Sequence, residues 1–191
     1  MPSHMKSLIF LVLIFVLSKS RLLPQDSPLK PVKDLNLELL SGRWYQLGRL
    51  SFDFETKCAC SVIKFALDLG DILQIESDCH WGSPSGKTVL VTGKVIPQDP
   101  VKDDVTTGKL EFDFPKEIDV PFYVFGLHTG YEWALLGNPD RKYLWILTKR
   151  PSVDDNLFEL LVKMSEEAGF DIEKLVHVDQ SNQCFQREMI F

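Results

Sequence analysis

The sequence predicts an all-β protein built as an eight-stranded up-and-down antiparallel barrel, with a C-terminal α-helix packed outside it. Two observations lead to this fold class. Between residues 43 and 149 short β-rich runs alternate with turn signals, and after Pro151 the spacing of apolar residues becomes helical. With 191 residues, 45% of them hydrophobic, the chain suits one domain with a sizeable core, because domains usually hold roughly 100–200 residues.

The formal net charge of −6 comes from acidic residues spread along the chain, without an acidic tail or a basic block. Lys149 and Arg150 form the densest basic pair, which is too small for a nucleic-acid patch. We therefore expect neither nucleic acid nor an anionic membrane surface as a partner.

Residues 1–20 have the pattern of a secretory signal peptide. Lys6 precedes an apolar run from Leu8 to Leu17, and small residues follow where a signal peptidase cleaves. A run of this length falls well short of the roughly 20 residues that span a bilayer. We expect removal of this segment, no stable membrane insertion, and a secreted, extracellular or lumenal protein.

An arm, a domain and a tail are expected to follow the signal peptide. Prolines recur through residues 21–36, and proline removes backbone donors and disfavours helix in its predecessor. This segment is therefore predicted to be an extended N-terminal arm. The folded domain is expected over residues 37–185, with a C-terminal tail over residues 186–191.

The eight predicted strands are bounded by glycine, proline, serine and aspartate turn signals, the clearest at 69–71, 82–86 and 137–140. Their predicted ranges are 43–50, 58–68, 71–78, 87–96, 108–114, 120–128, 131–136 and 142–149. A short ninth strand is expected from Leu175 to Val178.

The segment after Pro151 predicts an amphipathic helix. Ser152 and Asp155 are predicted to form its capping box, and Gly169 is predicted to end it. We expect its apolar face to pack on the barrel and not on a membrane. That face comprises Val153, Leu157, Leu160, Leu161, Met164 and Ala168.

Four cysteines, Cys58, Cys60, Cys79 and Cys184, predict two disulfides in an oxidising compartment. Cys58 and Cys60 are two residues apart on one strand and point to the same face, so each is expected to pair with one of the other two. Two connectivities remain open. The cysteines with His80 could instead bind zinc, but the spacing lacks the usual knuckle, and we expect no metal and no cofactor.

The strand around residues 110–114 shows which side chains face inward. Leu110, Phe112 and Phe114 alternate with Glu111 and Asp113. Burying two unpaired carboxylates is costly, so the aromatic face is predicted to be the inner one.

Two distant segments resemble the lipocalin family. Gly42-Arg43-Trp44-Tyr45 is similar to its Gly-x-Trp signature on the opening strand. Residues 138–149, followed by a capped helix, are similar to its last hairpin strand, where a cation stacks over that tryptophan at the closed end. The resemblance covers about 37–185 and is strongest to the apolipoprotein D and bacterial lipocalin branch. The family's middle motif is eroded at residues 128–133.

The resemblance implies a structural barrel floor made by Gly42, Trp44 and the basic pair Lys149 and Arg150. Lys149 aligns with the stacking position, which the family fills with arginine. Either Lys149 lies over Trp44, or a local bulge lets Arg150 take that place. Arginine would add a planar stacking surface that lysine lacks.

The resemblance also implies the disulfides Cys58–Cys79 and Cys60–Cys184 and a barrel that is open at one end. Bonds to an external tail would put Cys58 and Cys60 outside, so that residues of opposite parity on this strand face inward. The predicted ligand-binding residues are Ile63, Phe65, Leu110, Phe112, Phe114, Phe122, Val124, Tyr143 and Trp145.

These expectations imply a secreted carrier, monomeric or weakly self-associating, for a small hydrophobic ligand such as a fatty acid, lysolipid, sterol or isoprenoid. An aromatic and aliphatic lining favours such a ligand by roughly 25 cal/mol per Å² buried and has few polar groups to fix its orientation.

Two alternatives remain. The first is a lipocalin-fold enzyme acting on a lipid or carotenoid, with His128 near the barrel rim as the suspected residue. Neither His128 nor His177 lies near an identifiable nucleophile motif, so we expect no enzyme. The second is an interaction module whose barrel is filled by its own side chains.

Overall fold

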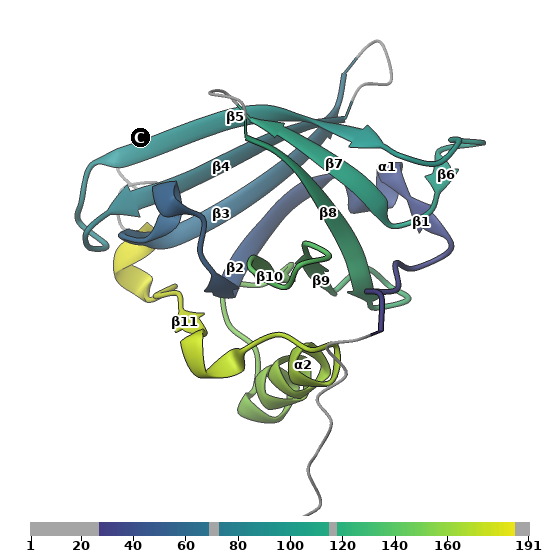
Figure 1. The fold of residues 1–191 in the computed structure, drawn as a ribbon. Coiled ribbons are helices and arrows are strands. Elements are labelled where there is room, and N and C mark those ends of the chain that lie inside the picture. The colour runs from purple at the N-terminus through teal and green to yellow at the C-terminus, as the bar shows by residue number, and fades with distance from the viewer. Residues whose placement is uncertain (1–26, 69–72, 115–117, 186–191) are drawn as a thin grey trace, which may run out of the picture.

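Eight antiparallel strands close into a barrel in the computed structural model, which describes residues 27–68, 73–114 and 118–185 (Figure 1). The strands follow one another in the order β2-β3-β4-β5-β7-β8-β9-β10, and β10 pairs with β2 to close the barrel. This is the predicted up-and-down barrel, with β11 added beside β2. The predicted signal peptide, the first part of the arm and the tail lie outside the described residues.

Each barrel strand overlaps its predicted range. The strands are β1 (Leu35–Asn36), β2 (Gly42–Leu50), β3 (Cys58–Leu67), β4 (Leu73–Trp81), β5 (Thr88–Pro97), β6 (Val105–Thr106), β7 (Lys109–Phe114), β8 (Ile118–Leu127), β9 (Trp133–Gly137), β10 (Leu144–Thr148) and β11 (Val176–His177). The helices are α1 (Leu37–Leu40), α2 (Asp155–Glu167) and the short 3-10 helices η2 (Asp53–Glu55), η3 (Ile172–Lys174) and η4 (Asn182–Phe185).

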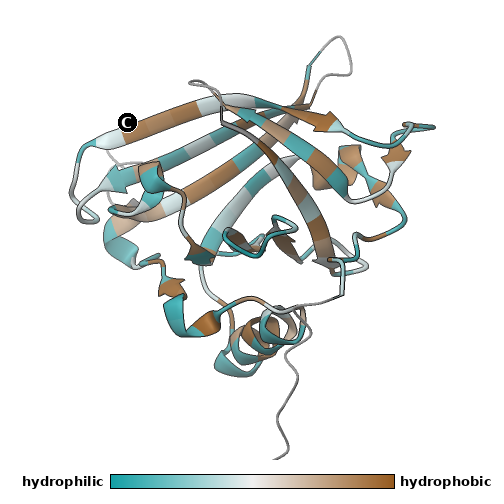
Figure 2. Ribbon diagram, viewed as in Figure 1, coloured by the Kyte–Doolittle hydropathy of each residue, from teal (hydrophilic) through white to brown (hydrophobic). Residues whose placement is uncertain are grey.

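Buried and more exposed residues alternate regularly along β4 and β7. Bands of hydrophobic and hydrophilic residues alternate along the same strands in Figure 2. On β7, Leu110, Phe112 and Phe114 are buried, while Glu111 and Asp113 are partly exposed. The inner face was therefore predicted correctly on this strand.

The pairing of β2 with β10 is irregular, with a register shift between Ile146 and Leu147. Leu147 pairs with Gln46 and Trp145 pairs with Arg49, and directly opposed residues of an antiparallel pair share a face. Because Trp145 and Leu147 belong to the inner core, Gln46 and Arg49 both face the barrel interior. Such a bulge reverses the alternation of side chains along the strand that contains the extra residue.

Helix α2 lies outside the barrel (Figure 1). Its Leu161 packs with Leu144 and Ile146, which point outward from β10, and with Phe170 beyond the helix. The apolar face differs from the prediction at Leu160, which is 49% exposed. No helix in the described ranges is long and apolar enough to cross a bilayer.

The capping box predicted for this helix is wrong. Asp154 is the N-cap, and its carboxylate accepts a hydrogen bond of 3.0 Å from the backbone N–H of Leu157. The helix therefore starts at Asp155, and Ser152 lies before the cap. Gly169 follows the helix with a φ of 94°, a left-handed conformation that glycine adopts without strain.

The described part of the arm packs against the barrel. Leu35 is fully buried and Leu29 nearly so. The N–H of Val32 donates to the carbonyl of Val124 at 2.8 Å, and its carbonyl accepts from Gly108 at the same distance. The core therefore includes residues that precede the predicted domain boundary.

Candidate functional site

The closed end of the barrel is built around Trp44. The Nζ of Lys149 lies 3.9 Å from the ring centroid and donates to the carbonyl of Ser41 at 3.1 Å. The pKa of Lys149 is lowered because burial disfavours its charged form, an effect that Glu132 opposes. Arg150, the other candidate for the stacked cation, is exposed.

Gly42 contributes to the same floor through its backbone. Its φ of 99° lies in the left-handed region, and a Cβ added there would stand 3.5 Å from Lys149 Nζ. The indole N–H of Trp44 donates to the carbonyl of Leu40 at 2.7 Å. These contacts fix the orientation of the ring that the lysine covers.

Disulfides join Cys58 to Cys79 and Cys60 to Cys184, the pairs that the resemblance implies. The prediction that both Cys58 and Cys60 face outward does not hold. A register shift near the start of β3 breaks the alternation between them. Cys79 is four residues after the core residue Ile75 on β4 and points to the same face, so the Cys58–Cys79 bridge lies on the inner face at the open end.

The nine predicted ligand-binding residues come together in the barrel interior. Tyr143 is partly buried, and the other eight are at most 1% exposed. The ring centroids of Phe112 and Phe122 are 4.8 Å apart, and that of Trp145 lies 4.8 Å from Phe122 and 5.5 Å from Phe112. Side chains that lined a water-sized cavity would keep accessible surface, so these side chains fill the space between them.

Two further aromatic residues, which the sequence analysis missed, close the open end. Phe52 is 2% exposed, and its ring stacks on Tyr143 at 4.0 Å and lies 5.9 Å from Trp145. Phe54 packs edge-on against Phe114 at 5.7 Å. Both rings belong to the segment Phe52–Glu55, hereafter the Phe52–Glu55 turn, which contains η2. Because the turn lies between two strands, its sequence carries no periodic signal that could have placed it in the interior.

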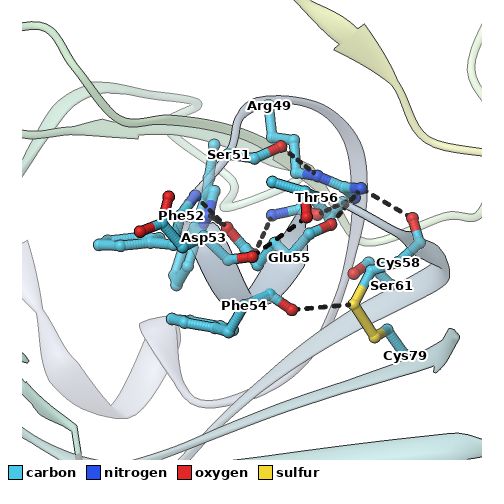
Figure 3. Close-up of a disulfide and its surroundings, with 12 residues drawn as sticks. Arg49, Ser51, Phe52, Asp53, Phe54, Glu55, Thr56, Cys58, Ser61 and Cys79 are labelled. Atoms are coloured by element: carbon cyan, nitrogen blue, oxygen red, sulfur yellow. Dashed lines mark hydrogen bonds between the residues drawn. A yellow bond between two sulfur atoms is a disulfide. The ribbon is translucent and has the colours of Figure 1, made fainter. Parts of the chain in front are cut away.

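The same turn buries a carboxylate (Figure 3). Glu55 is 1% exposed and accepts hydrogen bonds from Gln46 Nε2 at 3.1 Å and from Trp145 Nε1 at 3.2 Å. The N–H of Phe52 donates to it at 3.2 Å. Burial raises the pKa of Glu55, although these donors and the charge of Arg49 work in the opposite direction.

Arg49 organises the polar groups around this carboxylate (Figure 3). Its Nη2 donates to the carbonyls of Glu55 and Cys58, each at 2.7 Å, and its Nη1 donates to Gln46 Oε1 at 3.0 Å. The Nε donates to Ser51 Oγ at 2.9 Å. Arg49 is 1% exposed, and desolvation lowers its pKa while Glu55 raises it.

Sequence reasoning missed Gln46, Arg49 and Glu55. Regular alternation from Trp44 places Gln46 inside but Arg49 outside, and only the bulge in the β2–β10 pairing brings Arg49 inward. The expected lining with few polar groups is therefore corrected: one end of the interior holds a buried cation, a carboxylate and donor groups aimed at that carboxylate.

His128, suspected in the enzyme alternative, lines a surface groove of about 570 Å³ outside the barrel, together with Trp133, Arg150 and Asp154. Its Nδ1 accepts from the N–H of Gly130 at 3.2 Å. Within the described ranges, no group of three histidine, cysteine or acidic side chains is arranged to hold a metal ion.

Comparison with known proteins agrees with this architecture. The model of the lipocalin-like domain family matches residues 35–180. The outer membrane lipoprotein Blc of Vibrio cholerae is 28% identical over 90% of this chain and 98% of its own. Temperature-induced lipocalin-1 of Arabidopsis thaliana is 27% identical over 83% of this chain and 86% of its own.

Solved structures share the fold at lower identity. Insecticyanin of the tobacco hornworm Manduca sexta superposes with a TM-score of 0.61 at 19% identity, covering 82% of this chain and 86% of its own. Lobster apocrustacyanin A1 gives 0.59 at 18% identity, covering 77% and 81%. With the closed eight-stranded barrel, the external helix and the family match over most of its length, the chain belongs to the lipocalin family, in the branch that includes the bacterial lipocalins.

Proposed function

We propose that this protein binds and carries a small hydrophobic ligand, of the fatty acid, lysolipid, sterol or isoprenoid kind, inside the barrel and releases it unchanged. The observation that carries the proposal is the continuous aromatic interior. It runs from Phe65, which pairs with Gly42 at the closed end, through Phe112 to Phe52 and Tyr143 at the open end. Apolar surface buried there contributes roughly 25 cal/mol per Å².

Secretion is part of the same proposal. The two disulfides favour an oxidising compartment, and the N-terminal residues have the pattern of a signal peptide. The expected ligand-binding residues are the nine predicted ones, with Phe52 and Phe54 as the residues that must move. The floor around Trp44 and Lys149 stabilises the closed end and makes no contact with the ligand.

One observation favours a second candidate, an interaction module with a filled barrel. The predicted lining side chains are already in contact with one another, and large apolar side chains such as Trp81 and Leu90 are exposed on the surface. A carrier must therefore rearrange to bind its ligand, whereas an interaction module need not.

Native mass spectrometry of the protein from a secreting host, followed by extraction, distinguishes these functions. Recovery of an unmodified lipid at near-stoichiometric amounts supports the carrier. A chemically altered product that accumulates with time points to the enzyme instead. An empty protein that also binds no added fatty acid, sterol or retinoid contradicts the carrier proposal and favours the interaction module.

A further inference from the structure

The Phe52–Glu55 turn has the chemical character of a ligand. It inserts two aromatic rings into an apolar barrel and ends in a buried carboxylate. The Phe52 ring contacts Tyr143, Phe122 and Trp145, which are predicted ligand-binding residues. The turn thus brings an apolar body and an anionic end into one site.

The groups facing the Glu55 carboxylate are hydrogen-bond donors. The indole Nε1 of Trp145 donates and cannot accept. Gln46 could present either end of its amide, but Arg49 donates to its Oε1, which leaves its Nε2 to face Glu55. The wall therefore offers two fixed donors to an acceptor inside the barrel.

The positive charge of Arg49 favours an anion as the hydrogen-bond acceptor at this site. Arg49 is buried, and Glu55 is the acidic side chain that acts on its pKa. Its guanidinium reaches the Glu55 carboxylate through Gln46, which accepts from Arg49 Nη1 and donates to Glu55. A buried charge that loses its compensating partner is strongly destabilising. If Glu55 moved out and a neutral ligand took its place, the positive charge of Arg49 would stay buried without a compensating negative charge. A ligand carboxylate would supply that negative charge.

The turn can leave this site as a unit. Inside it, the N–H of Glu55 donates to the carbonyl of Phe52 at 2.9 Å. Thr56, the residue that follows the turn, donates from its Oγ1 to the carbonyl of Asp53 at 3.1 Å. The N–H of Phe52 and the Glu55 carboxylate are also paired within it. When the turn leaves the barrel it keeps these internal hydrogen bonds, and it loses its contacts with the barrel wall and with Arg49.

We propose that the Phe52–Glu55 turn is a built-in competitor, and that the ligand is an apolar monocarboxylate whose carboxylate replaces that of Glu55 on Gln46 and Trp145. The hydrocarbon tail takes the space of Phe52 and Phe54. This inference rests on the proposed function and specifies its ligand class. The displaced turn lies outside the barrel in the complex.

Calorimetric titration of the protein purified from a secreting host, with laurate and with methyl laurate at pH 7.5, tests the charge requirement. The two probes share an alkyl chain and differ in the anionic end. The expected result is that laurate binds about tenfold or more tightly, since a hydrogen-bonded charged group contributes that much. Equal affinities, or binding of neither probe, overturn this inference. The carrier proposal is contradicted only if added sterol and retinoid also fail to bind.

Variants assign the effect to named residues. Trp145→Phe is expected to lower the affinity for laurate about tenfold and the affinity for methyl laurate much less. Trp133→Phe, outside the barrel, is expected to change neither affinity. Glu55→Gln weakens the binding of the Phe52–Glu55 turn in the barrel. It is expected to raise the affinity for both probes about tenfold, with laurate still bound more tightly than methyl laurate. An unchanged laurate affinity in Glu55→Gln overturns the displacement, even if Trp145→Phe fails to fold.

Amide hydrogen exchange tests whether the Phe52–Glu55 turn leaves the barrel when the ligand binds. Amides of residues 51–57 are expected to exchange faster in the laurate complex than in the free protein, whereas the barrel strands become more protected. Slower exchange in this segment on binding would mean that the turn closes over the ligand, and would overturn the displacement.

Discussion

The Glu55 carboxylate accepts a hydrogen bond of 3.2 Å from the indole of Trp145, although the two residues are 90 positions apart in the chain. Both are buried, Trp145 among the rings of the barrel core and Glu55 beside Arg49. The bond links the loop that follows β2 to the strand that closes the barrel. It makes the open end of this lipocalin a polar site within an aromatic interior.

Phe52→Ala is expected to destabilise the protein and tighten ligand binding. Losing a buried phenylalanine costs about 3–5 kcal/mol of unfolding free energy, while the space it leaves becomes available to the ligand. Urea unfolding and laurate titration measure the two effects. Phe125→Ala is the matched control, because Phe125 stacks on Phe170 outside the barrel at 5.1 Å. It should lower stability without tightening binding, and a parallel gain in affinity would contradict the role of Phe52.

The pH dependence of stability should report on Glu55. Its pKa is raised in the folded protein above the ordinary value of 4.5, so its contribution to stability is fully present at low pH and is lost as the pH rises through the raised pKa. Glu55→Gln removes this titration. The stability of the variant relative to the wild type should therefore be higher at pH 7 than at pH 4. A difference in urea-derived unfolding free energies that stays constant between these pH values would contradict the assignment.

The sequence predicts the barrel well where alternation is uninterrupted. On β7 the pattern of Leu110, Phe112 and Phe114 against two acids assigns the inner face without ambiguity, because an unpaired buried carboxylate is costly. The same rule fails on β2, where a bulge brings Arg49 inside, and at Cys58 on β3. A bulge of one residue moves the side chains that follow it to the opposite face of the strand, and the pattern of hydrophobic residues in the sequence does not reveal the bulge.

The polar end of the site could not be predicted for a related reason. Glu55 lies in a turn whose conformation depends on contacts with Gln46 and Arg49, which the bulge turns inward, and with Trp145, which is 90 positions away in the chain. Its sequence alone is typical of an exposed loop with acidic residues. Tertiary contacts decide its burial, and local sequence does not.

Lys149→Met is expected to lower the unfolding free energy by about 1–3 kcal/mol, because it removes the cation over Trp44 and the bond to Ser41. Lys149→Arg should retain most of the stability, since a guanidinium can also stack on the ring. Arg150→Met, at an exposed position, should change stability by about 0.5 kcal/mol or less. Equal losses at positions 149 and 150 in thermal or urea unfolding would contradict the assignment of the floor to Lys149.

The two disulfides should contribute unequally. Cys60–Cys184 spans 124 positions and Cys58–Cys79 spans 21, and a longer loop constrains the unfolded chain more. Replacing both cysteines of the first pair by serine should lower the unfolding free energy by about 1–2 kcal/mol more than replacing the second pair. Urea unfolding of the two double variants checks the order, and a larger loss for Cys58–Cys79 would show that local contacts at the open end outweigh loop length.

The indole N–H resonance of Trp145 gives the most direct test of ligand binding inside the barrel. It can be assigned by comparison with Trp145→Phe and followed by NMR during titration with laurate, with Trp133 as the internal reference outside the interior. The Trp145 signal is expected to shift to a saturable end point at the calorimetric stoichiometry, while the Trp133 signal stays in place. A ligand that binds without moving the Trp145 signal, or that moves the Trp133 signal instead, would place the site on the outer surface and would contradict binding inside the barrel.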